Sequence, residues 1–222
     1  MSQSMHSKTI VITGASTGIG RACALHLDKL GFQVIAGIRT ETDAASLQQA
    51  SSDRLTTVHI DIAKSDNILR ATNIIETQLK SVGLYGLINN AGIVIAGPLE
   101  FVPIDALRSQ LEINVVGHIA ITQALLPLLR QAKGRIINMS SVSGRVATPF
   151  LGPYAASKFA LEALSDSMRL ELMPWEINVS VIEPGPISTP IWSKSIEATK
   201  LMIDKLPEKA KVLYGPAFEA AL

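Results

Sequence analysis

The protein has 222 residues, of which 47% are hydrophobic and 18% are charged, and its formal net charge is +1. A chain of this size can bury one sizeable core, so we expect a single domain over residues 1–222. The near-neutral charge, with no run of basic residues, argues against a nucleic-acid partner, and the single cysteine, Cys23, excludes an intramolecular disulfide and a cysteine zinc cluster.

Short apolar runs alternate with longer amphipathic stretches along the chain. Strands are predicted at 8–13, 33–37, 55–61, 86–89, 134–139 and 178–183, and helices at 18–30, 44–50, 65–80, 104–130 and 154–172. Strands that alternate with helices of this length imply right-handed crossovers and a parallel sheet covered on both faces. The predicted fold is therefore α/β, a doubly wound parallel sheet in three α/β/α layers.

Two segments bear on location. Residues 1–8 are polar, so we expect a flexible N-terminus without a secretory signal and, together with the lone cysteine, a cytoplasmic protein. The most apolar stretch, 115–129, is interrupted by His118, Thr122 and Pro127. It is predicted to be a buried or interface helix, and no membrane span is expected.

A glycine-rich loop connects the first predicted strand to the first predicted helix. Its sequence is Thr13-Gly14-Ala15-Ser16-Thr17-Gly18-Ile19-Gly20. Glycines at such a place let the backbone approach a pyrophosphate, while the helix N-terminus offers N–H groups and a positive dipole. A purely structural turn is the alternative. No Gly-Lys-Ser/Thr follows, which argues against a kinase or ATPase.

Arg39 occupies the end of the second predicted strand, about twenty residues past the loop. A domain that prefers NAD(H) usually has an acid there, which hydrogen bonds the ribose hydroxyl. An arginine can instead pair with a 2′-phosphate through its planar guanidinium. We therefore predict NADP(H) over NAD(H), with a solvated surface arginine as the alternative.

Several polar or glycine residues directly follow predicted strands. They are Gly14, Asp61, Asn90, Ser141 and the pair Pro184-Gly185. In an open parallel sheet the ligand crevice lies beyond the carboxyl ends of the strands, so these residues are expected to meet there.

Tyr154 and Lys158 are four residues apart in a predicted helix, which places the phenol and the ammonium on one face. A tyrosine has a reference pKa of about 10, and a fixed cation beside it favours the phenolate. The pair can therefore serve acid–base chemistry. The alternative is an ordinary pair on a half-exposed helix.

Together these motifs, in this order, resemble the short-chain dehydrogenase/reductase family from Lys8 to about Thr189. The matching residues are Thr13 to Gly20, Asp61, Asn89-Asn90-Ala91-Gly92, Asn114, Ser141, Tyr154, Lys158 and Pro184-Gly185. The runs around Ser141, Tyr154, Arg169 and Glu183 are most similar to the retinol and hydroxysteroid dehydrogenase branch. The resemblance implies a Rossmann-like domain and an oxidoreductase that transfers a hydride between NADP(H) and a carbonyl or alcohol.

The resemblance also implies cofactor-binding residues. They are Gly14, Ser16, Thr17, Gly18, Ile19 and Gly20 in the loop, Arg39 at the 2′-phosphate, Asp61 and Ile62 at the adenine, Asn90, Ala91 and Gly92 along the groove, Pro184, Gly185, Ile187 and Thr189 at the nicotinamide, and Tyr154 and Lys158 at the reacting end.

Four catalytic residues follow from the same resemblance. Tyr154 is expected to be the general acid in reduction and the base in oxidation, with Lys158 lowering its pKa and bonding the nicotinamide ribose. Ser141 is expected to donate a hydrogen bond to the substrate oxygen, and Asn114 to hold a water that links Lys158 to solvent. The thirteen-residue gap from Ser141 to Tyr154 favours Ser141 over Ser140.

A lipophilic substrate is predicted from two apolar segments. Residues Arg145 to Pro153 are expected to form a wall of the substrate pocket, and residues 190–210 to form an amphipathic helix that closes over it as a lid. Trp192, Met202, Ile203 and Leu206 lie in that second segment. Its alternative is a packed surface helix. The expected substrate is a ketone, an aldehyde or a secondary alcohol.

The chain ends at Leu222, where family members usually continue into a further strand, so we expect a C-terminal strand to be missing. The apolar faces of the helices at 104–130 and 154–172 are expected to form a homodimer or homotetramer.

Other functions find less support in the sequence. His26, His59 and His118 fall on different elements, so no metal site is predicted, and no nucleophile elbow surrounds Ser141. A non-catalytic NAD(P)-sensing protein, or an epimerase or dehydratase on the same scaffold, are the alternatives to an oxidoreductase.

Overall fold

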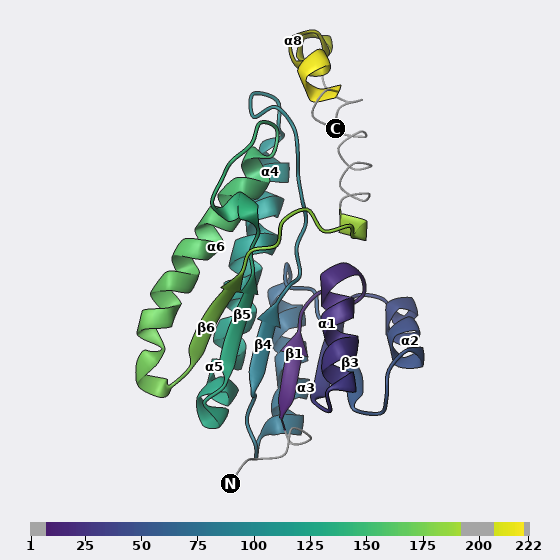
Figure 1. Cartoon of the computed structure of the whole chain (residues 1–222), viewed down its shortest axis with the longest axis vertical. Helices are drawn as coiled ribbons and strands as arrows, with labels where there is room; N and C mark the ends of the chain where they lie inside the picture. Colours follow the sequence, from purple (N-terminus) through teal and green to yellow (C-terminus); the bar gives the residue numbers. More distant parts are fainter. Residues whose placement is uncertain (1–7, 192–206, 220–222) are drawn as a thin grey trace.

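The computed structural model describes residues 8–191 and 207–219 (Figure 1). Six strands form one sheet: β1 (Thr9–Ile12), β2 (Gln33–Ile38), β3 (Leu55–His59), β4 (Gly86–Asn89), β5 (Arg135–Met139) and β6 (Asn178–Ile182). The strand order is β3-β2-β1-β4-β5-β6, and every pair is parallel. The predicted doubly wound parallel sheet is confirmed.

The helices of the described residues are α1 (Gly18–Lys29), α2 (Glu41–Gln49), α3 (Ser65–Leu79), α4 (Ile104–Leu111), α5 (Gly117–Ala132), α6 (Gly152–Glu171) and α8 (Glu208–Glu219). A π-helical segment, Glu112–Val116, joins α4 to α5, and short 3₁₀ turns lie at Val142–Gly144 and Met173–Trp175.

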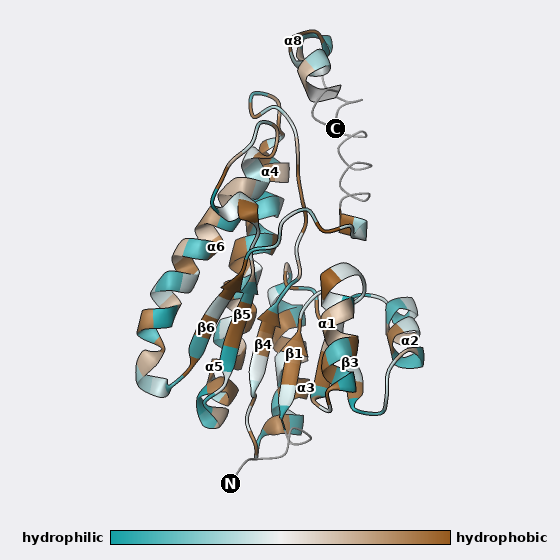
Figure 2. Cartoon of the chain, in the orientation of Figure 1, coloured by the Kyte–Doolittle hydropathy of each residue, from teal (hydrophilic) through white to brown (hydrophobic). Residues whose placement is uncertain are grey.

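Alternation along the central strands builds two cores, one on each face of the sheet. In β1, Ile10 and Ile12 join one apolar cluster and Val11 joins the other, because successive strand residues point to opposite faces. The first cluster packs against α1 and α2, and the second against α3 and α5. The central strands are correspondingly apolar in Figure 2.

Local chemistry sets several helix boundaries. The helix α2 begins at Glu41, three residues before the predicted start, because the Thr40 hydroxyl accepts a hydrogen bond from the Asp43 N–H at 3.1 Å. The long helical region predicted over 104–130 is confirmed, and within it a π turn at Glu112–Val116 brings Asn114 inside. The helical periodicity carries no signal for this turn, because it depends on a tertiary contact.

One helical stretch is long and apolar enough to be compared with a membrane span. By length and composition, Ile104–Ala132 could cross a membrane, with a mean hydropathy of 1.4 in its most apolar window. Its fully buried residues Ile121, Leu125 and Leu129 belong to the apolar cluster through which α3 and α5 pack against the sheet. Core packing therefore accounts for part of its hydropathy, and the absence of a membrane span stays a prediction.

The two ends of the chain are only partly described. Residues 1–7, and Trp192, Met202, Ile203 and Leu206 of the predicted lid, lie outside the described residues. The helix α8 contacts the rest of the molecule through Tyr214, whose hydroxyl donates to a Glu100 carboxylate oxygen at 2.8 Å. Among the residues that the structure describes, no further strand pairs with the outer side of β6.

We expect Leu125→Ala to lower the free energy of unfolding by about 2–5 kcal/mol, because it opens a cavity in a fully buried site. Urea denaturation checks this result. Leu170→Ala is the matched control, since Leu170 is 68% exposed on α6, and it should change stability by less than about 0.5 kcal/mol. Equal effects of the two variants would contradict the assigned core.

Candidate active site

A crevice of about 500 Å³ opens at the carboxyl ends of the strands. Because parallel strands present their carboxyl ends on one edge, the loops after β1, β2, β3, β4, β5 and β6 all converge there. The predicted site residues that line it are Gly14, Ser16, Thr17, Gly18, Ile19, Arg39, Asp61, Ile62, Asn90, Ala91, Gly92, Asn114, Ser141, Tyr154, Lys158, Pro184, Gly185, Ile187 and Thr189.

Gly20 is the one predicted site residue that does not line the crevice. A β-carbon at Gly20 would collide with the Asn90 amide nitrogen and with the Gly14 carbonyl oxygen. Gly20 therefore serves the close packing of α1 behind the loop. Its contact with a cofactor stays a prediction.

The glycine loop forms a cradle at the start of α1. Gly14 has φ +65°, and a β-carbon there would lie 2.7 Å from the Ala91 Cα. Thr17 is the N-cap residue, and its side chain makes no capping hydrogen bond within the described part of the chain. The first N–H groups of α1 are therefore available to an anion, and the helix dipole favours one.

The segment after β4 is fixed against this loop. The Thr13 hydroxyl oxygen accepts from the N–H groups of Asn90 and Ala91 at 3.0 and 3.1 Å. The Asn90 amide in turn donates to the carbonyls of Thr13 and Gly14, both at 3.0 Å. These bonds make one rigid floor from two loops that are distant in sequence.

The ends of β2 and β3 form the far side of the crevice. Arg39 is exposed there and makes no ion pair with any residue that the structure describes. The Asp61 carboxylate accepts from the Ala63 N–H at 3.1 Å and lies 3.7 Å from Lys64 Nζ. Asp61 thus holds the turn that presents Ile62.

Asn114 is fully buried in the π-helical segment and braces three elements. Its Oδ1 accepts from the Ile93 N–H at 2.9 Å, and its Nδ2 donates to the Ile93 carbonyl at 3.0 Å and to Ser157 Oγ at 3.1 Å. The amide therefore ties the segment after β4 to α6. The predicted water relay through Asn114 stays a prediction.

Ser141, Tyr154 and Lys158 come together beside the end of β5. The Ser141 hydroxyl, which accepts from the Ser143 N–H at 3.1 Å, also hydrogen bonds the Tyr154 phenol. Lys158 donates from Nζ to the Met139 carbonyl at 2.7 Å, and the same nitrogen lies 5.7 Å from the centre of the Tyr154 ring. One turn of α6 and one strand end thus place a hydroxyl, a phenol and an ammonium in one crevice.

Burial controls the ionisation of this group. Desolvation raises the pKa of the Tyr154 phenol, and the hydrogen bond from Ser141 opposes that rise. Desolvation lowers the pKa of Lys158 to about 8, while the Glu162 carboxylate raises it. Burial is thus the largest influence on the pKa of Tyr154. The expectation that Lys158 lowers that pKa stays a prediction.

The loop after β6 forms one side of the crevice. Pro184 accepts at its carbonyl from the Val142 N–H at 3.1 Å, which ties this loop to the Ser141 segment. Further along, the Thr189 Cβ would lie 3.4 Å from a β-carbon at Gly18. The loop thus reaches from Ser141 to the glycine cradle.

Two buried residues of the site were missed in the sequence. The Ser157 hydroxyl donates to the Tyr154 carbonyl at 2.6 Å and accepts from Asn114, so it fixes the first turn of α6. His118 lies 2.6 Å through Nε2 from the Ala91 carbonyl, and burial lowers the pKa of His118 to about 3. The neutral ring therefore donates from Nε2 and supports the floor from behind. The spacing of Ser157 and His118 in the sequence does not predict these roles, because both residues act through contacts between distant elements.

The predicted substrate wall, Arg145 to Pro153, does not line the crevice. No residue of 145–153 lines the 500 Å³ crevice, and Val146 is exposed. Phe150 instead packs against Tyr214 of α8, with ring centres 6.5 Å apart. The apolar residues that line the crevice include Ile93, Val94 and Ile95.

Within 8–191 and 207–219, no group of three or more histidine, cysteine or acidic side chains is arranged to hold a metal ion.

Comparison with known proteins found a matching family model and several similar sequences. A family model described as short chain dehydrogenase matches residues 8–200. Retinol dehydrogenase 5 of Mus musculus is 44% identical over 212 residues, which cover 94% of this chain and 66% of that protein. 17-beta-hydroxysteroid dehydrogenase type 6 of Bos taurus is 40% identical, with 96% and 68% covered. The chain thus spans about two thirds of the length of these relatives.

Solved structures share the fold. A 3-ketoacyl-(acyl-carrier-protein) reductase from Brucella melitensis, complexed with NADH, has a TM-score of 0.79 at 26% identity and covers 84% of this chain and 78% of its own. A short chain dehydrogenase from Burkholderia cenocepacia in complex with NADP has a TM-score of 0.75 at 31% identity, with 84% and 76% covered.

The buried Lys158 predicts a pH-dependent stability. Its folded pKa of about 8 lies below the ordinary 10.5, so the cost of burying the ammonium is fully present below pH 8 and is relieved as the pH rises towards 10.5. Relative to Lys158→Met, the wild-type free energy of unfolding should therefore rise by roughly 2–3 kcal/mol over that window. Urea denaturation at pH 7 and pH 10 measures it.

Lys29→Met is the control for that experiment, since Lys29 is exposed at the end of α1. It should follow the wild-type pH profile. Parallel profiles for wild type and Lys158→Met would contradict the buried ammonium.

Proposed function

The chain belongs to the short-chain dehydrogenase family, and from that premise we propose that it is an oxidoreductase that interconverts a lipophilic carbonyl compound and its alcohol with NADP(H). The observation that carries this proposal is the convergence of Ser141, Tyr154 and Lys158 in one crevice beyond the sheet.

The crevice fits a dinucleotide. Gly14 and Gly18 have positive φ, the start of α1 offers uncapped N–H groups, and the two glycines bring the backbone close to whatever lies in the cradle. The cradle would hold the pyrophosphate. The groove along Asn90, Ala91 and Gly92 would then lead towards Tyr154, and a bound reduced nicotinamide would supply the hydride.

Side chains of the protein would donate the proton and return it to the donor. Because burial raises the pKa of Tyr154, the phenol is held protonated, which is the form that donates a proton to a carbonyl oxygen during reduction. The Ser141 hydroxyl lies beside it and can donate a second hydrogen bond to that oxygen as negative charge develops. The carbonyl thus gains a hydride at carbon and a proton at oxygen. Lys158, with its pKa near 8, can return a proton towards the phenolate.

The preference for NADP(H) rests on Arg39. Arg39 lines the crevice directly after β2, where an acid would repel a 2′-phosphate. Because Arg39 makes no ion pair with any described residue, it would pair with the phosphate without first breaking another contact. Of the structural relatives above, one carries NADH and one NADP, so the preference is proposed on this residue alone.

The lipophilic substrate class is proposed from the apolar lining of Ile93, Val94 and Ile95, and the retinol and hydroxysteroid names of the relatives agree with it. Spectrophotometric assay of NADPH oxidation against a panel of lipophilic ketones and aldehydes, with sugars and keto acids as comparison, tests the proposal. Turnover of the lipophilic compounds supports it. Cofactor binding without turnover would instead favour a sensing protein, and epimerised or dehydrated product the other alternative.

We also propose a cytoplasmic location and a homodimer or homotetramer. Val116 on the π segment and Phe159 and Leu164 on α6 are exposed apolar residues that a second copy could cover. Sedimentation analysis would distinguish these assemblies from a monomer.

We expect Tyr154→Phe to reduce turnover by about 10²–10⁴-fold, because the variant keeps the ring and loses the proton donor. The dissociation constant for NADPH, measured by fluorescence titration, should change by less than about threefold. Tyr85→Phe is the control, since Tyr85 stacks on Phe32 away from the crevice. Retention of most activity in Tyr154→Phe would refute the assigned acid.

We expect Arg39→Ala to weaken NADPH binding by about tenfold or more, because it removes a charge-assisted pair with the 2′-phosphate. Binding of NADH should change by less than about twofold. Isothermal titration with each cofactor measures both, and Arg70→Ala, which removes an exposed arginine of α3, serves as the control. An unchanged NADPH affinity would show that Arg39 is an ordinary surface residue.

A further inference from the structure

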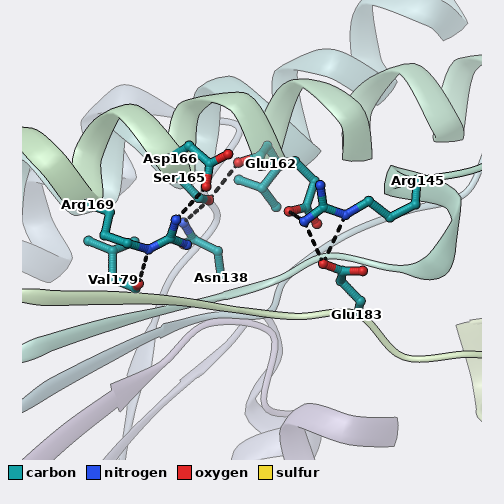
Figure 3. Close-up of polar contacts among 9 residues, drawn as sticks. Asn138, Arg145, Glu162, Ser165, Asp166, Arg169, Val179 and Glu183 are labelled. Carbon is teal, nitrogen blue, oxygen red and sulfur yellow. Dashed lines mark hydrogen bonds and ion pairs between the residues drawn. The ribbon is translucent and has the colours of Figure 1, made fainter.

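Arg145 joins three segments of the site through its guanidinium (Figure 3). Its Nη2 donates to a Glu162 carboxylate oxygen at 3.1 Å, and its Nε and Nη2 both donate to Glu183 Oε1, at 3.1 and 2.9 Å. Arg145 directly follows the 3₁₀ turn Val142–Gly144, Glu162 lies on α6, and Glu183 directly precedes Pro184. The side chain thus spans the loops after β5 and β6 and the helix between them.

Glu162 is the buried partner of this cluster. Its side chain is 6% exposed, whereas that of Arg145 is 58% exposed and that of Glu183 is 33% exposed. Its Oε1 has no hydrogen-bond partner among the described residues. A buried carboxylate is costly unless it is paired, so Glu162 depends on Arg145 for a hydrogen-bonded counter-charge.

The 3₁₀ turn packs tightly on that carboxylate. A β-carbon at Gly144 would lie 2.8 Å from Ser140 Oγ and 3.2 Å from Glu162 Oε1. The same turn is anchored to the Ser141 side chain, which accepts from the Ser143 N–H, and to the Pro184 carbonyl, which accepts from the Val142 N–H. Any shift of the turn away from α6 would therefore move the Ser141 hydroxyl relative to Tyr154.

We propose that Arg145 is a positioning residue: by pairing with Glu162 and Glu183, it holds the Ser141 turn and the Pro184–Gly185 loop against the helix that carries Tyr154 and Lys158. Its effect on turnover rests on the proposed function, but its effect on the backbone does not. Misplacement of a reacting group by about 1 Å can cost about 10²-fold in rate, so even a small loosening is measurable.

Arg169, which lies on α6, supplies a matched control (Figure 3). It pairs with Asp166 of α6 and donates from Nε to the Val179 carbonyl of β6 at 2.9 Å. Both arginines thus tie α6 to the β6 side of the sheet, and only Arg145 does so at the crevice. Substitution of either arginine should lower the stability of the protein. Only substitution of Arg145 should also disturb the geometry of the crevice.

The experiment compares Arg145→Met, Arg145→Lys and Arg169→Met with wild type by hydrogen–deuterium exchange and by steady-state kinetics. Arg145→Met should speed amide exchange at 142–146, where the backbone N–H groups are hydrogen bonded, by about fivefold or more. It should also lower kcat about tenfold, with the KM for NADPH changed by less than about threefold. Arg145→Lys should restore part of kcat, because a lysine keeps the charge without the planar guanidinium. Arg169→Met should leave kcat and amide exchange at 142–146 at wild-type values.

The pH profile gives a further signature. The titratable groups that bear on Lys158 are Tyr154 and Glu162 on α6 and His118 on α5, and Glu162 is the one that raises the pKa of Lys158. Glu162→Gln should therefore move the alkaline limb of the rate profile to lower pH. Arg145→Met, which leaves the Glu162 charge uncompensated, should move that limb to higher pH.

The outcomes separate the two proposals. Faster exchange at 142–146 in a protein that turns over no carbonyl compound would refute the proposed function and support the positioning role of Arg145. Wild-type exchange and wild-type kcat in Arg145→Met would overturn that role. If Arg145→Met does not fold, Glu183→Gln, which alters only the partly exposed partner, should still speed exchange of the Val142 N–H, which donates to the Pro184 carbonyl. An unchanged rate there would overturn the positioning role as well.

Discussion

Lys158 carries an ammonium group into the interior of the protein, where it is 5% exposed and donates to the Met139 carbonyl at 2.7 Å. Removing such a charge from water is costly, and the lowered pKa of Lys158 records that cost. The surroundings offset it through the strand-end carbonyl and the carboxylate of Glu162 on the next turn of α6. The arrangement of the site follows from keeping this one cation buried beside Tyr154.

The rest of the crevice is built from strand ends that the parallel sheet brings to one edge. Thr13 joins the loop after β1 to the segment after β4, Asn114 joins that segment to α6, and Arg145 joins α6 to the loops after β5 and β6. Each loop is thus held by side-chain bonds to a neighbour that is distant in sequence. Such cross-bracing suits a reaction in which a hydroxyl, a phenol and a bound cofactor must keep a common geometry.

Much of this could be predicted from the sequence, because its signals are local. The alternation of β-branched runs with amphipathic stretches predicted the sheet, and the residues that directly follow strands, such as Gly14, Asn90 and Ser141, predicted the crevice. Features that depend on tertiary contacts could not be predicted. The π turn at Asn114 exists because its amide bonds Ile93, and the raised pKa of Tyr154 reflects a degree of burial that no spacing encodes. The close packing at Gly20 could not be predicted either, since a glycine that permits close packing and one that contacts a cofactor have the same sequence signature.

The central claim is that the Tyr154 crevice directs a hydride from a nicotinamide to a carbonyl carbon. The most direct measurement uses NADPH that carries deuterium in place of both C4 hydrogens, with a lipophilic ketone, and locates the label in the product by mass spectrometry and NMR. The account predicts an alcohol with one deuterium on the carbinol carbon and none elsewhere. An unlabelled alcohol, or label that stays wholly in the cofactor while product accumulates, would contradict it.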